Sequence, residues 1–275
     1  MSNFKGKVVW ITGGNSGIGE AVARNLAAKG AQLILSARRE EALRQVADGL
    51  PPESKPMILA LDVTDTLKVK EATDRVMETF GKVDLLFNAA GISQRSSVVE
   101  TDLEVHRKIM EVNYFATVSI TKSVLPHMLK AGRGHVAVIT SLTGKFGFPM
   151  RSAYAASKHA LHGFFESLHL EYKHLGIDVT VIAPGPVNTP ISFSALGPDG
   201  KPTGKMDEMQ AKAMSPEVCA RHIVDALEAK KQEVVIGTAK EKFGVKLNAW
   251  WPSLFFNMLS KQHRAELKNG SDETV

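Results

Sequence analysis

The sequence predicts an α/β fold in which helices cover both faces of a doubly wound, seven-stranded parallel sheet. Three observations predict it: seven short apolar runs recur along the chain, helical patterns separate them, and a glycine-rich turn follows the first run. The runs are almost continuously apolar and β-branched, which is typical of strands buried on both faces of a parallel sheet. Strands that alternate with helices indicate βαβ units, which build a sheet of this kind.

The seven predicted strands occupy Val8–Ile11, Leu33–Leu35, Ile58–Leu61, Leu85–Phe87, Val136–Ile139, Val179–Ala183 and Val234–Ile236. Between the first two strands, Ile18, Val22 and Leu26 recur every four residues, so we expect a helix that buries this face. The stretch after Tyr154 has the same spacing, and a long helix is expected there. Cys219 lies in a further predicted helix and is expected to be a small core residue.

Two segments depart from this alternation. Residues 190–215 are rich in glycine, proline and charge and are too long for an ordinary connection, so we expect a flexible loop that closes over a site. Residues 241–275 form a basic and aromatic extension that includes Trp250 and Trp251. Three alternatives stay open for the extension: it packs against its own domain, it caps a pocket or contacts another subunit, or residues 245–264 lie on an anionic membrane surface.

The composition is that of an ordinary globular protein, with a net charge of +5 and a pI of 9.2. Most of the basic excess lies in residues 240–270, and no other stretch combines lysine and arginine with stacking aromatics, which argues against nucleic-acid binding. The one cysteine excludes an internal disulfide, and no apolar run reaches 18 residues. We therefore expect a cytoplasmic protein, with peripheral membrane association as the open alternative.

A phosphate-binding turn is predicted where the first strand runs into Thr12-Gly13-Gly14-Asn15-Ser16-Gly17-Ile18-Gly19. Glycines there let the backbone approach a pyrophosphate, and the N-terminus of the following helix offers free N–H groups and a positive dipole end. The turn is not a P-loop, because Glu20 stands where that loop needs a lysine. A tight strand–helix turn that binds no ligand is the alternative.

The end of the second predicted strand favours NADP(H) over NAD(H). NAD-specific sites place an acidic residue there to hold the ribose 2′-hydroxyl, whereas this chain has Ala37. Arg38 and Arg39 follow, and their guanidinium groups match a 2′-phosphate. The alternative is a solvated pair of arginines compensated by Glu40 and Glu41.

Candidate catalytic side chains begin with Tyr154 and Lys158, which lie four residues apart and so share one face of the expected helix. A cation beside the phenol would stabilise the phenolate and lower the pKa of Tyr154 toward neutrality, where proton transfer to an alkoxide is efficient. Ser141 follows the strand Val136–Ile139 at its carboxyl end, and its hydroxyl can donate to a substrate carbonyl. Each feature alone is common in proteins, so the prediction depends on their combination.

That combination resembles the short-chain dehydrogenase/reductase family. The motifs of the family occur in order between residues 7 and 190, as T-G-x-x-x-G-x-G at Thr12–Gly19, Asp62-Val63, Asn88-Ala89-Ala90-Gly91, Asn113, Ser141, Tyr154-x-x-x-Lys158 and Pro184-Gly185. Four further segments resemble the dehydrogenase/reductase member 7 branch, namely Ser93-Gln94-Arg95-Ser96, Val124-Leu125-Pro126-His127-Met128, Ser157-Lys158-His159-Ala160-Leu161 and Pro184-Gly185-Pro186-Val187. The resemblance implies a Rossmann-like domain over residues 1–240 that binds a dinucleotide and carries the catalytic site.

The resemblance also implies a role for individual residues. Tyr154 would be the acid–base catalyst, Lys158 would hold the nicotinamide ribose, and Ser141 would orient the carbonyl. Asn113 would hold a water molecule that links Lys158 to solvent, and Asp62 would contact the adenine. The residues implied to bind the cofactor are Gly13, Asn15, Ser16, Gly17, Ile18, Gly19, Arg38, Arg39, Asp62, Val63, Asn88, Ala89, Gly91, Tyr154, Lys158, Pro184, Gly185, Val187 and Thr189.

We therefore expect an NADP(H)-dependent oxidoreductase that interconverts a carbonyl and an alcohol on a hydrophobic substrate such as a steroid, a retinoid or a lipid-like compound. The apolar residues expected to face this substrate are Phe148, Met150, Ile191 and Phe193. The alternatives are a 3-oxoacyl-carrier-protein reductase and a non-catalytic NADP-sensing regulator. The resemblance implies a homodimer or homotetramer. No metal site is expected, because His159 and His162 lack a third ligand.

Overall fold

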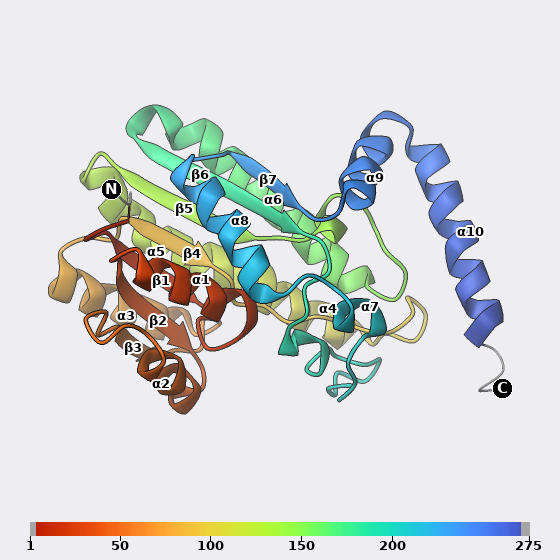
Figure 1. Ribbon diagram of the computed structural model, residues 1–275, viewed down its shortest axis with the longest axis horizontal. Coiled ribbons are helices and arrows are strands. Elements are labelled where there is room, and N and C mark those ends of the chain that lie inside the picture. Colours follow the sequence, from red (N-terminus) through yellow and green to blue (C-terminus); the bar gives the residue numbers. More distant parts are fainter. Residues whose placement is uncertain (1–3, 271–275) are drawn as a thin grey trace.

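The structure, a computed structural model, describes residues 4–270 and is built around a seven-stranded parallel sheet (Figure 1). The strands are β1 (Val8–Thr12), β2 (Gln32–Ala37), β3 (Met57–Ala60), β4 (Leu85–Asn88), β5 (Gly134–Ile139), β6 (Ile177–Pro184) and β7 (Glu233–Ile236). Their order in the sheet is β3-β2-β1-β4-β5-β6-β7, and every neighbouring pair is parallel. All seven predicted strands are confirmed, with only small differences in their bounds.

Helices cover both faces of the sheet, as predicted. Those that precede the last strand are α1 (Gly17–Ala28), α2 (Glu40–Asp48), α3 (Thr66–Phe80), α4 (Leu103–Met110), α5 (Ala116–Lys130), α6 (Ser152–Tyr172), α7 (Glu208–Ala211) and α8 (Pro216–Glu228). The helices α1, α2 and α8 bury their apolar residues against one face, and α3, α5 and α6 bury theirs against the other. The doubly wound fold is therefore confirmed.

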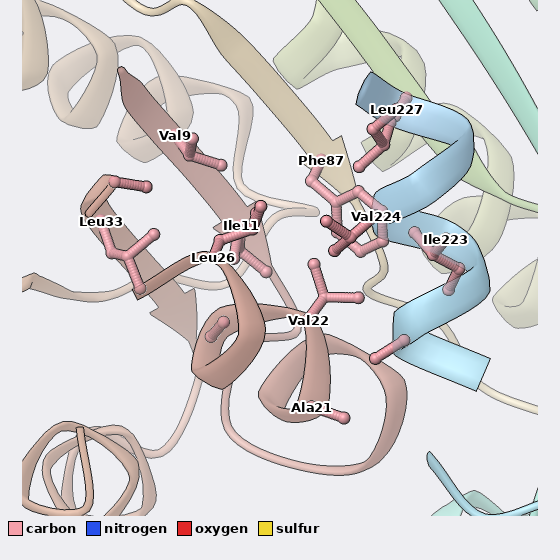
Figure 2. Close-up of a cluster of buried hydrophobic side chains, with 14 of the residues drawn as sticks. Val9, Ile11, Ala21, Val22, Leu26, Leu33, Phe87, Ile223, Val224 and Leu227 are labelled. Atoms are coloured by element: carbon pink, nitrogen blue, oxygen red, sulfur yellow. The ribbon is translucent and has the colours of Figure 1, made fainter. Parts of the chain in front are cut away.

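The helices α1 and α8 form a continuous apolar core with the sheet (Figure 2). Val22 and Leu26 of α1 are fully buried, as the four-residue spacing predicts, and they belong to the same cluster as Ile11 and Phe87 of the sheet. Burial of a side chain of this size stabilises the fold by about 1.5–3 kcal/mol. Cys219 of α8 is also fully buried in this cluster, which confirms its predicted place in the core.

The strand order creates a crevice at the carboxyl ends of β1 and β4. The chain leaves β1 toward β2 on one side and later returns to β4 on the other, so the connections after these two strands diverge. Thr12, the last residue of β1, is in register with Ser36 of β2 and with Asn88 of β4. In open parallel sheets, ligands bind at such a crevice.

After β7 the chain continues into α9 (Ala239–Trp250) and α10 (Pro252–Gly270), and α10 projects away from the sheet (Figure 1). We call α9 and α10 together the C-terminal arm. The last five residues of the predicted extension, 271–275, lie outside the described residues. Within residues 4–270, no helix is both long enough and apolar enough to cross a membrane.

Candidate active site

The turn after β1 is packed so closely that no side chain fits at Gly13 or Gly19. Gly13 and Gly17 have φ angles of +66° and +56°, a left-handed conformation that glycine adopts without strain. A Cβ on Gly13 would lie 2.8 Å from the backbone nitrogen of Ala90, and one on Gly19 would lie 2.2 Å from the carbonyl oxygen of Gly13. The glycine spacing therefore reflects a backbone turn pressed against the segment after β4.

Thr12 joins this turn to the end of β4. Its Oγ1 accepts hydrogen bonds from the backbone nitrogens of Ala89 at 3.1 Å and Ala90 at 3.2 Å. At the start of α1, the side chain of Ser16 makes no capping hydrogen bond, and the first turn of the helix faces a cavity. The free N–H groups and the positive end of the helix dipole are therefore available to an anion such as a pyrophosphate.

Charged side chains gather where β2 and β3 end. Arg38 and Arg39 line the same cavity as the glycine turn, and Asp62 lines it after β3. Asp62 Oδ1 accepts hydrogen bonds from the backbone nitrogen of Thr64 at 3.0 Å and from its hydroxyl at 2.7 Å. Burial alone would raise the pKa of Asp62, but these hydrogen bonds and the charge of Arg38 hold it below its usual value. Asp62 is therefore an ionised hydrogen-bond acceptor at neutral pH.

Ser141, Tyr154 and Lys158 meet on one wall of the cavity. Ser141 follows β5 and caps a short 3₁₀ turn, η2 (Leu142–Gly144). Tyr154 lies in the first turn of α6 and shares a hydrogen bond with Ser141. One turn further, Lys158 donates from Nζ to the carbonyl oxygen of Ile139 at 2.9 Å, and this Nζ lies 5.6 Å from the centre of the Tyr154 ring. A hydroxyl, a phenol and an ammonium group are thus brought together.

The protonation state of Tyr154 differs from the sequence-based prediction. Burial raises its pKa to about 12, although the hydrogen bond with Ser141 and the charge of Arg95 act in the opposite direction. Burial also lowers the pKa of Lys158 to about 8. The predicted lowering of the Tyr154 pKa by Lys158 is therefore wrong, because the cost of burying a phenolate outweighs the effect of the nearby charges. At neutral pH the phenol is protonated and can donate its proton.

Asn113 and Asn88 are buried and are not among the residues that line the cavity, so the contact of Asn88 with a cofactor stays a prediction. Asn113 is fully buried in a π-helical turn, η1 (Glu111–Phe115), between α4 and α5. Its Oδ1 accepts a hydrogen bond from the backbone nitrogen of Ile92 at 2.8 Å, and its Nδ2 donates to Ser157 Oγ at 2.9 Å. The side chain thus braces the segment after β4 against α6. The role of Asn113 in holding a water molecule stays a prediction.

One cavity of about 1280 Å³ connects the glycine turn to the catalytic group. The predicted cofactor-binding residues that line it are Gly13, Asn15, Ser16, Gly17, Ile18, Gly19, Arg38, Arg39, Asp62, Val63, Ala89, Gly91, Tyr154, Lys158, Pro184, Gly185, Val187 and Thr189. Apolar side chains line its other end, among them Phe146, Phe148, Ile191, Leu196, Leu247, Phe255, Met258 and Leu259. The cavity therefore has one end suited to a nucleotide and one suited to an apolar molecule.

The structure corrects part of the predicted substrate-facing set. Phe148 and Ile191 line the cavity, whereas Met150 and Phe193 do not. Met150 lies in the turn before α6 with a φ angle of +61°, and its side chain is 43% exposed. Phe193 follows a 3₁₀ turn, η4 (Pro190–Ser192), and is 47% exposed. The prediction for these two residues is wrong, because both turns leave the side chain in solvent.

The predicted loop at residues 190–215 contains short elements and covers part of the cavity. It includes η4 and the single helical turn α7, and its residue Leu196 forms a parallel bridge with Gln94. Ser194, Asp207 and Gln210 of this segment line the cavity. The segment therefore takes part in the site, while its flexibility stays a prediction.

The C-terminal arm contributes to the apolar end of the cavity. Phe255 and Leu259 of α10 lie on its wall. The ring of Phe255 packs edge-on against Phe146, which follows η2, with ring centroids 4.7 Å apart. Asn248 of α9 donates from Nδ2 to the carbonyl oxygen of Lys145 at 3.1 Å. Part of the arm is thus fixed over the cavity, in line with the capping alternative.

A charged cluster beside Tyr154 was not predicted. Nη2 of Arg95 lies 2.9 Å from Oδ2 of Asp207, and Nη2 of Arg151 lies 3.5 Å from the same oxygen. Arg95 and Asp207 are far apart in the sequence, and no spacing rule relates them. The one available signal was the resemblance of Ser93-Gln94-Arg95-Ser96 to other proteins, which gives no partner for Arg95.

Within residues 4–270, no group of three His, Cys, Asp or Glu side chains is arranged to hold a metal ion. The two histidines considered as metal ligands, His159 and His162, do not lie in such a group. His159 Nδ1 lies 2.8 Å from the carbonyl oxygen of Ala155. His162 is largely buried, and burial lowers its pKa to about 4.

The residues at the nucleotide end fit a nicotinamide dinucleotide. The turn at Gly13 has no room for a Cβ, and the start of α1 presents free N–H groups to the same cavity. Asp62 and the two arginines after β2 offer polar groups at one end of this region. The catalytic wall lies at the other end, where a nicotinamide would meet a substrate.

The chain is similar to known dehydrogenases along most of its length. A family model described as short chain dehydrogenase matches residues 7–196. A dehydrogenase/reductase SDR family member 7B from Bos taurus is 40% identical over 269 residues, which cover 95% of this chain and 83% of the relative. A dehydrogenase/reductase SDR family protein 7-like from Drosophila melanogaster is 39% identical over 279 residues, which cover 100% of this chain and 85% of the relative. The crystal structure of a short-chain dehydrogenase from Streptomyces avermitilis has a TM-score of 0.77 and 28% identity, with 98% of this chain and 97% of that chain covered.

Proposed function

The chain belongs to the short-chain dehydrogenase family, and on that basis we propose that it is an NADP(H)-dependent oxidoreductase that interconverts a carbonyl and an alcohol on a hydrophobic substrate. The observation that carries the proposal is the presence of Ser141, Tyr154 and Lys158 on the wall of one cavity, between the glycine turn and an apolar end. The nicotinamide cofactor, when bound, supplies or accepts a hydride.

In this proposal the residues of the catalytic wall handle the substrate oxygen and its proton. The Ser141 hydroxyl donates a hydrogen bond to the carbonyl oxygen and stabilises the charge that develops there. Tyr154 gives its proton to the same oxygen. The raised pKa of Tyr154 keeps the phenol protonated at neutral pH, as a proton donor to the carbonyl oxygen requires. Lys158, whose Nζ donates to the carbonyl oxygen of Ile139, would bind the nicotinamide ribose in this proposal.

The acid–base role is tested by Tyr154→Phe, which removes the phenolic proton and keeps the ring. We expect turnover to be abolished while NADPH still binds, because the glycine turn and Lys158 are untouched. Tyr172→Phe, at the far end of the same helix and away from the cavity, is the matched control and is expected to keep its activity. Turnover in Tyr154→Phe comparable to that of the wild type would contradict the mechanism.

The proposed preference for NADP(H) is supported by the residues that follow β2. Arg38 and Arg39 line the cavity, and Ala37 presents no carboxylate to repel a 2′-phosphate. The alternative of a compensated arginine pair is weakened because Glu40 is engaged by Arg44 at 2.6 Å. The guanidinium groups of Arg38 and Arg39 would match a ligand phosphate at this place.

We expect NADPH to have a higher kcat/KM than NADH, and Arg38→Ala to reduce this advantage by about 10- to 100-fold, the worth of one hydrogen bond to a charged group. Arg44→Ala removes a nearby arginine outside the cavity and serves as the control. Both cofactors are compared in steady-state kinetics with each variant. A wild-type enzyme that prefers NADH would contradict the assignment.

The apolar end of the cavity supports a hydrophobic carbonyl compound as the substrate, of the size of a steroid, a retinoid or a lipid-like ketone or aldehyde. NADPH oxidation is measured against ketosteroids, retinal, quinones, aliphatic ketones and 3-oxoacyl thioesters. A clear preference for the thioesters would instead favour a 3-oxoacyl-carrier-protein reductase. Tight NADPH binding without turnover of any carbonyl would favour a sensing role.

We also propose that the C-terminal arm contacts anionic membrane surfaces peripherally. Its Trp250 and Trp251 are 66% and 60% exposed. The same arm carries exposed basic residues, namely Lys240, Lys242, Lys246, Lys261 and Arg264. Tryptophan and lysine suit the membrane interface. A Trp250→Ser/Trp251→Ser variant, which leaves the cavity wall intact, should lose co-sedimentation with anionic vesicles. Equal sedimentation of the wild type and this variant would contradict the contact.

A homodimer or homotetramer is proposed on the basis of the family. Large apolar side chains are exposed near the catalytic helix, as at Phe115 after α4 and Leu170 on α6. Light scattering measures the mass in solution. Phe115→Ser/Leu170→Ser should lower this mass, and a wild-type protein that is monomeric at assay concentration would contradict the proposal.

A further inference from the structure

The segment between β4 and α4 holds Arg95 beside the start of the helix that carries Tyr154. The preceding residue, Gln94, is fully buried, and its Oε1 accepts a hydrogen bond from the backbone nitrogen of Ala153 at 2.9 Å. Ala153 directly precedes Tyr154 in α6. A hydrogen bond thus joins the residue before Arg95 to the residue before Tyr154. The guanidinium lies close enough to the phenol for its positive charge to favour the phenolate.

Arg95 also holds the segment 190–215 that covers the cavity. Its backbone nitrogen donates to the carbonyl oxygen of Leu196 at 2.8 Å. Its Nη2 lies 2.9 Å from Oδ2 of Asp207 and donates to Gln210 Oε1 at 3.2 Å. The side chains of Arg95 and Asp207 are 17% and 20% exposed, so water screens this ion pair only in part. Because Asp207 and Gln210 line the cavity, the ion pair fixes a piece of the cavity wall.

The charges of this cluster do not balance. Arg151 also approaches Asp207, with its Nη2 3.5 Å from the same oxygen, so two guanidinium groups share one carboxylate. Nη1 of Arg95 is buried and makes no hydrogen bond within the described part of the chain. A buried cation with an unused donor is costly until an anion or acceptor becomes available. The phenolate of Tyr154, formed when the phenol gives up its proton, is such an anion.

Other charged groups also face this part of the cavity. They are Lys158 of α6, Arg151 at its N-cap, Asp207 of the covering segment, Lys108 of α4 and Glu111 of η1. Lys158 directs its Nζ to the carbonyl oxygen of Ile139. Asp207 and Glu111 are acidic and oppose a second negative charge. Arg95 is the cation whose buried Nη1 has no protein acceptor within residues 4–270.

We propose that Arg95 is a positioning residue that couples closure of the segment 190–215 to proton transfer at Tyr154. Asp207 anchors the segment on Arg95 and neutralises part of its charge. Arg95 presents the remaining charge to the phenolic oxygen and stabilises the phenolate left after the proton is given to the substrate. The inference rests on the proposed acid–base role of Tyr154.

The ionisation of Tyr154 can be followed without turnover, because the chain contains three tyrosines. The full chain, labelled with ¹³C at tyrosine Cζ, is titrated toward alkaline pH by NMR with and without NADP⁺, and Tyr154→Phe identifies the signal. Arg95→Met should move the ionisation of Tyr154 to higher pH, seen as a smaller ionised fraction at a fixed alkaline pH, because a nearby cation is lost. Asp207→Asn should move it to lower pH, because Arg95 is then less neutralised. Arg151→Met, which removes the other arginine of the cluster, is the matched control and should shift it less than Arg95→Met.

Opposite shifts in Arg95→Met and Asp207→Asn support the coupling. If the ion pair were merely structural, both variants would shift the ionisation of Tyr154 in the same direction. Unchanged ionisation in both variants, or shifts in the same direction, overturn it. If Arg95→Met does not fold, as judged by circular dichroism, Asp207→Asn decides alone: ionisation at lower pH supports the proposal, and an unchanged or higher pH overturns it. Opposite shifts in a chain that reduces no carbonyl would contradict the proposed function and leave the electrostatic coupling standing.

The anchoring step has its own readout. Lys205 and Lys212 are trypsin sites within the covering segment, because neither is followed by proline. Cleavage there should be several-fold faster in both Arg95→Met and Asp207→Asn than in the wild type, because each variant breaks the same ion pair. Cleavage at the wild-type rate in both variants would overturn the anchoring role of Asp207.

Discussion

Replacement of Gly19 by alanine tests how closely the nucleotide turn is built. The added Cβ would lie 2.2 Å from the carbonyl oxygen of Gly13 and 2.9 Å from its carbonyl carbon. Cβ atoms in proteins essentially never come within 3.0 Å of such atoms, and neither atom belongs to a side chain that could rotate away. The backbone of the turn must therefore move by about 1 Å, a misplacement that costs about 100-fold where geometry controls function.

We expect Gly19→Ala to weaken NADPH binding by about 100-fold, or about 2.8 kcal/mol. The fold should also lose about 1–3 kcal/mol of stability through overpacking. Alanine is favoured over glycine inside a helix by about 1 kcal/mol, and Gly19 lies in α1. A loss of stability would thus show that the clash outweighs the gain in helix propensity.

Gly14→Ala is the matched control in the same turn. Its Cβ would meet Leu35 Cδ2 at 3.3 Å as its nearest neighbour, and this side chain can adjust. We expect affinity within about threefold of the wild type. Fluorescence titration measures NADPH binding, and thermal unfolding measures stability. If Gly19→Ala bound NADPH as tightly as Gly14→Ala, the close packing of the turn would not control the nucleotide site.

Three further predictions concern the core. His135 is buried with Nε2 2.8 Å from Thr180 Oγ1, and burial lowers its pKa to about 4. Since the unfolded chain takes up this proton at higher pH, the free energy of unfolding should fall as the pH drops from about 6.5 to 4, and urea titrations of His135→Gln should show a weaker dependence. Cys219 should be inert to thiol reagents in the native protein and reactive after unfolding, because burial raises its pKa to about 12; rapid native reaction at neutral pH would contradict this. Trp10→Phe removes the donor of a buried hydrogen bond to Ser36 Oγ at 3.0 Å and should cost about 1–3 kcal/mol in chemical unfolding, whereas wild-type stability would show that this bond contributes nothing.

The strands and the helix faces were predictable because burial leaves a local pattern in the sequence. β6 is buried at every position, and it appears in the sequence as a continuous apolar run around Val179–Ala183. Val22 and Leu26 are buried because residues four apart share a helix face. The glycine turn was also recognisable, since Gly13 and Gly19 meet backbone atoms that no side chain could replace.

The features that were mispredicted or missed depend on contacts between distant segments. The spacing of Tyr154 and Lys158 places them on one helix face, but it does not report how much solvent Tyr154 loses when the domain closes around it. This loss of solvent raises the pKa of Tyr154, because a buried phenolate is poorly solvated. The ion pair of Arg95 and Asp207 joins two loops that share no periodic pattern. Met150 was judged apolar and near the catalytic helix, and only its backbone turn reveals that it faces solvent.

The place of β1 inside the sheet, between β2 and β4, has a consequence for the newly made chain. β1 pairs with β2 on one edge and with β4 on the other, and the backbone nitrogen of Val8 donates to Asp84, 76 residues further along, at 2.9 Å. At about 5–20 residues per second, translation leaves that second edge without its partner for roughly 4–15 s. A bare strand edge can pair with other chains, so this interval is when aggregation competes with folding. Nucleotide can stabilise the nascent domain only after β4 has left the ribosome, because the crevice needs both strands.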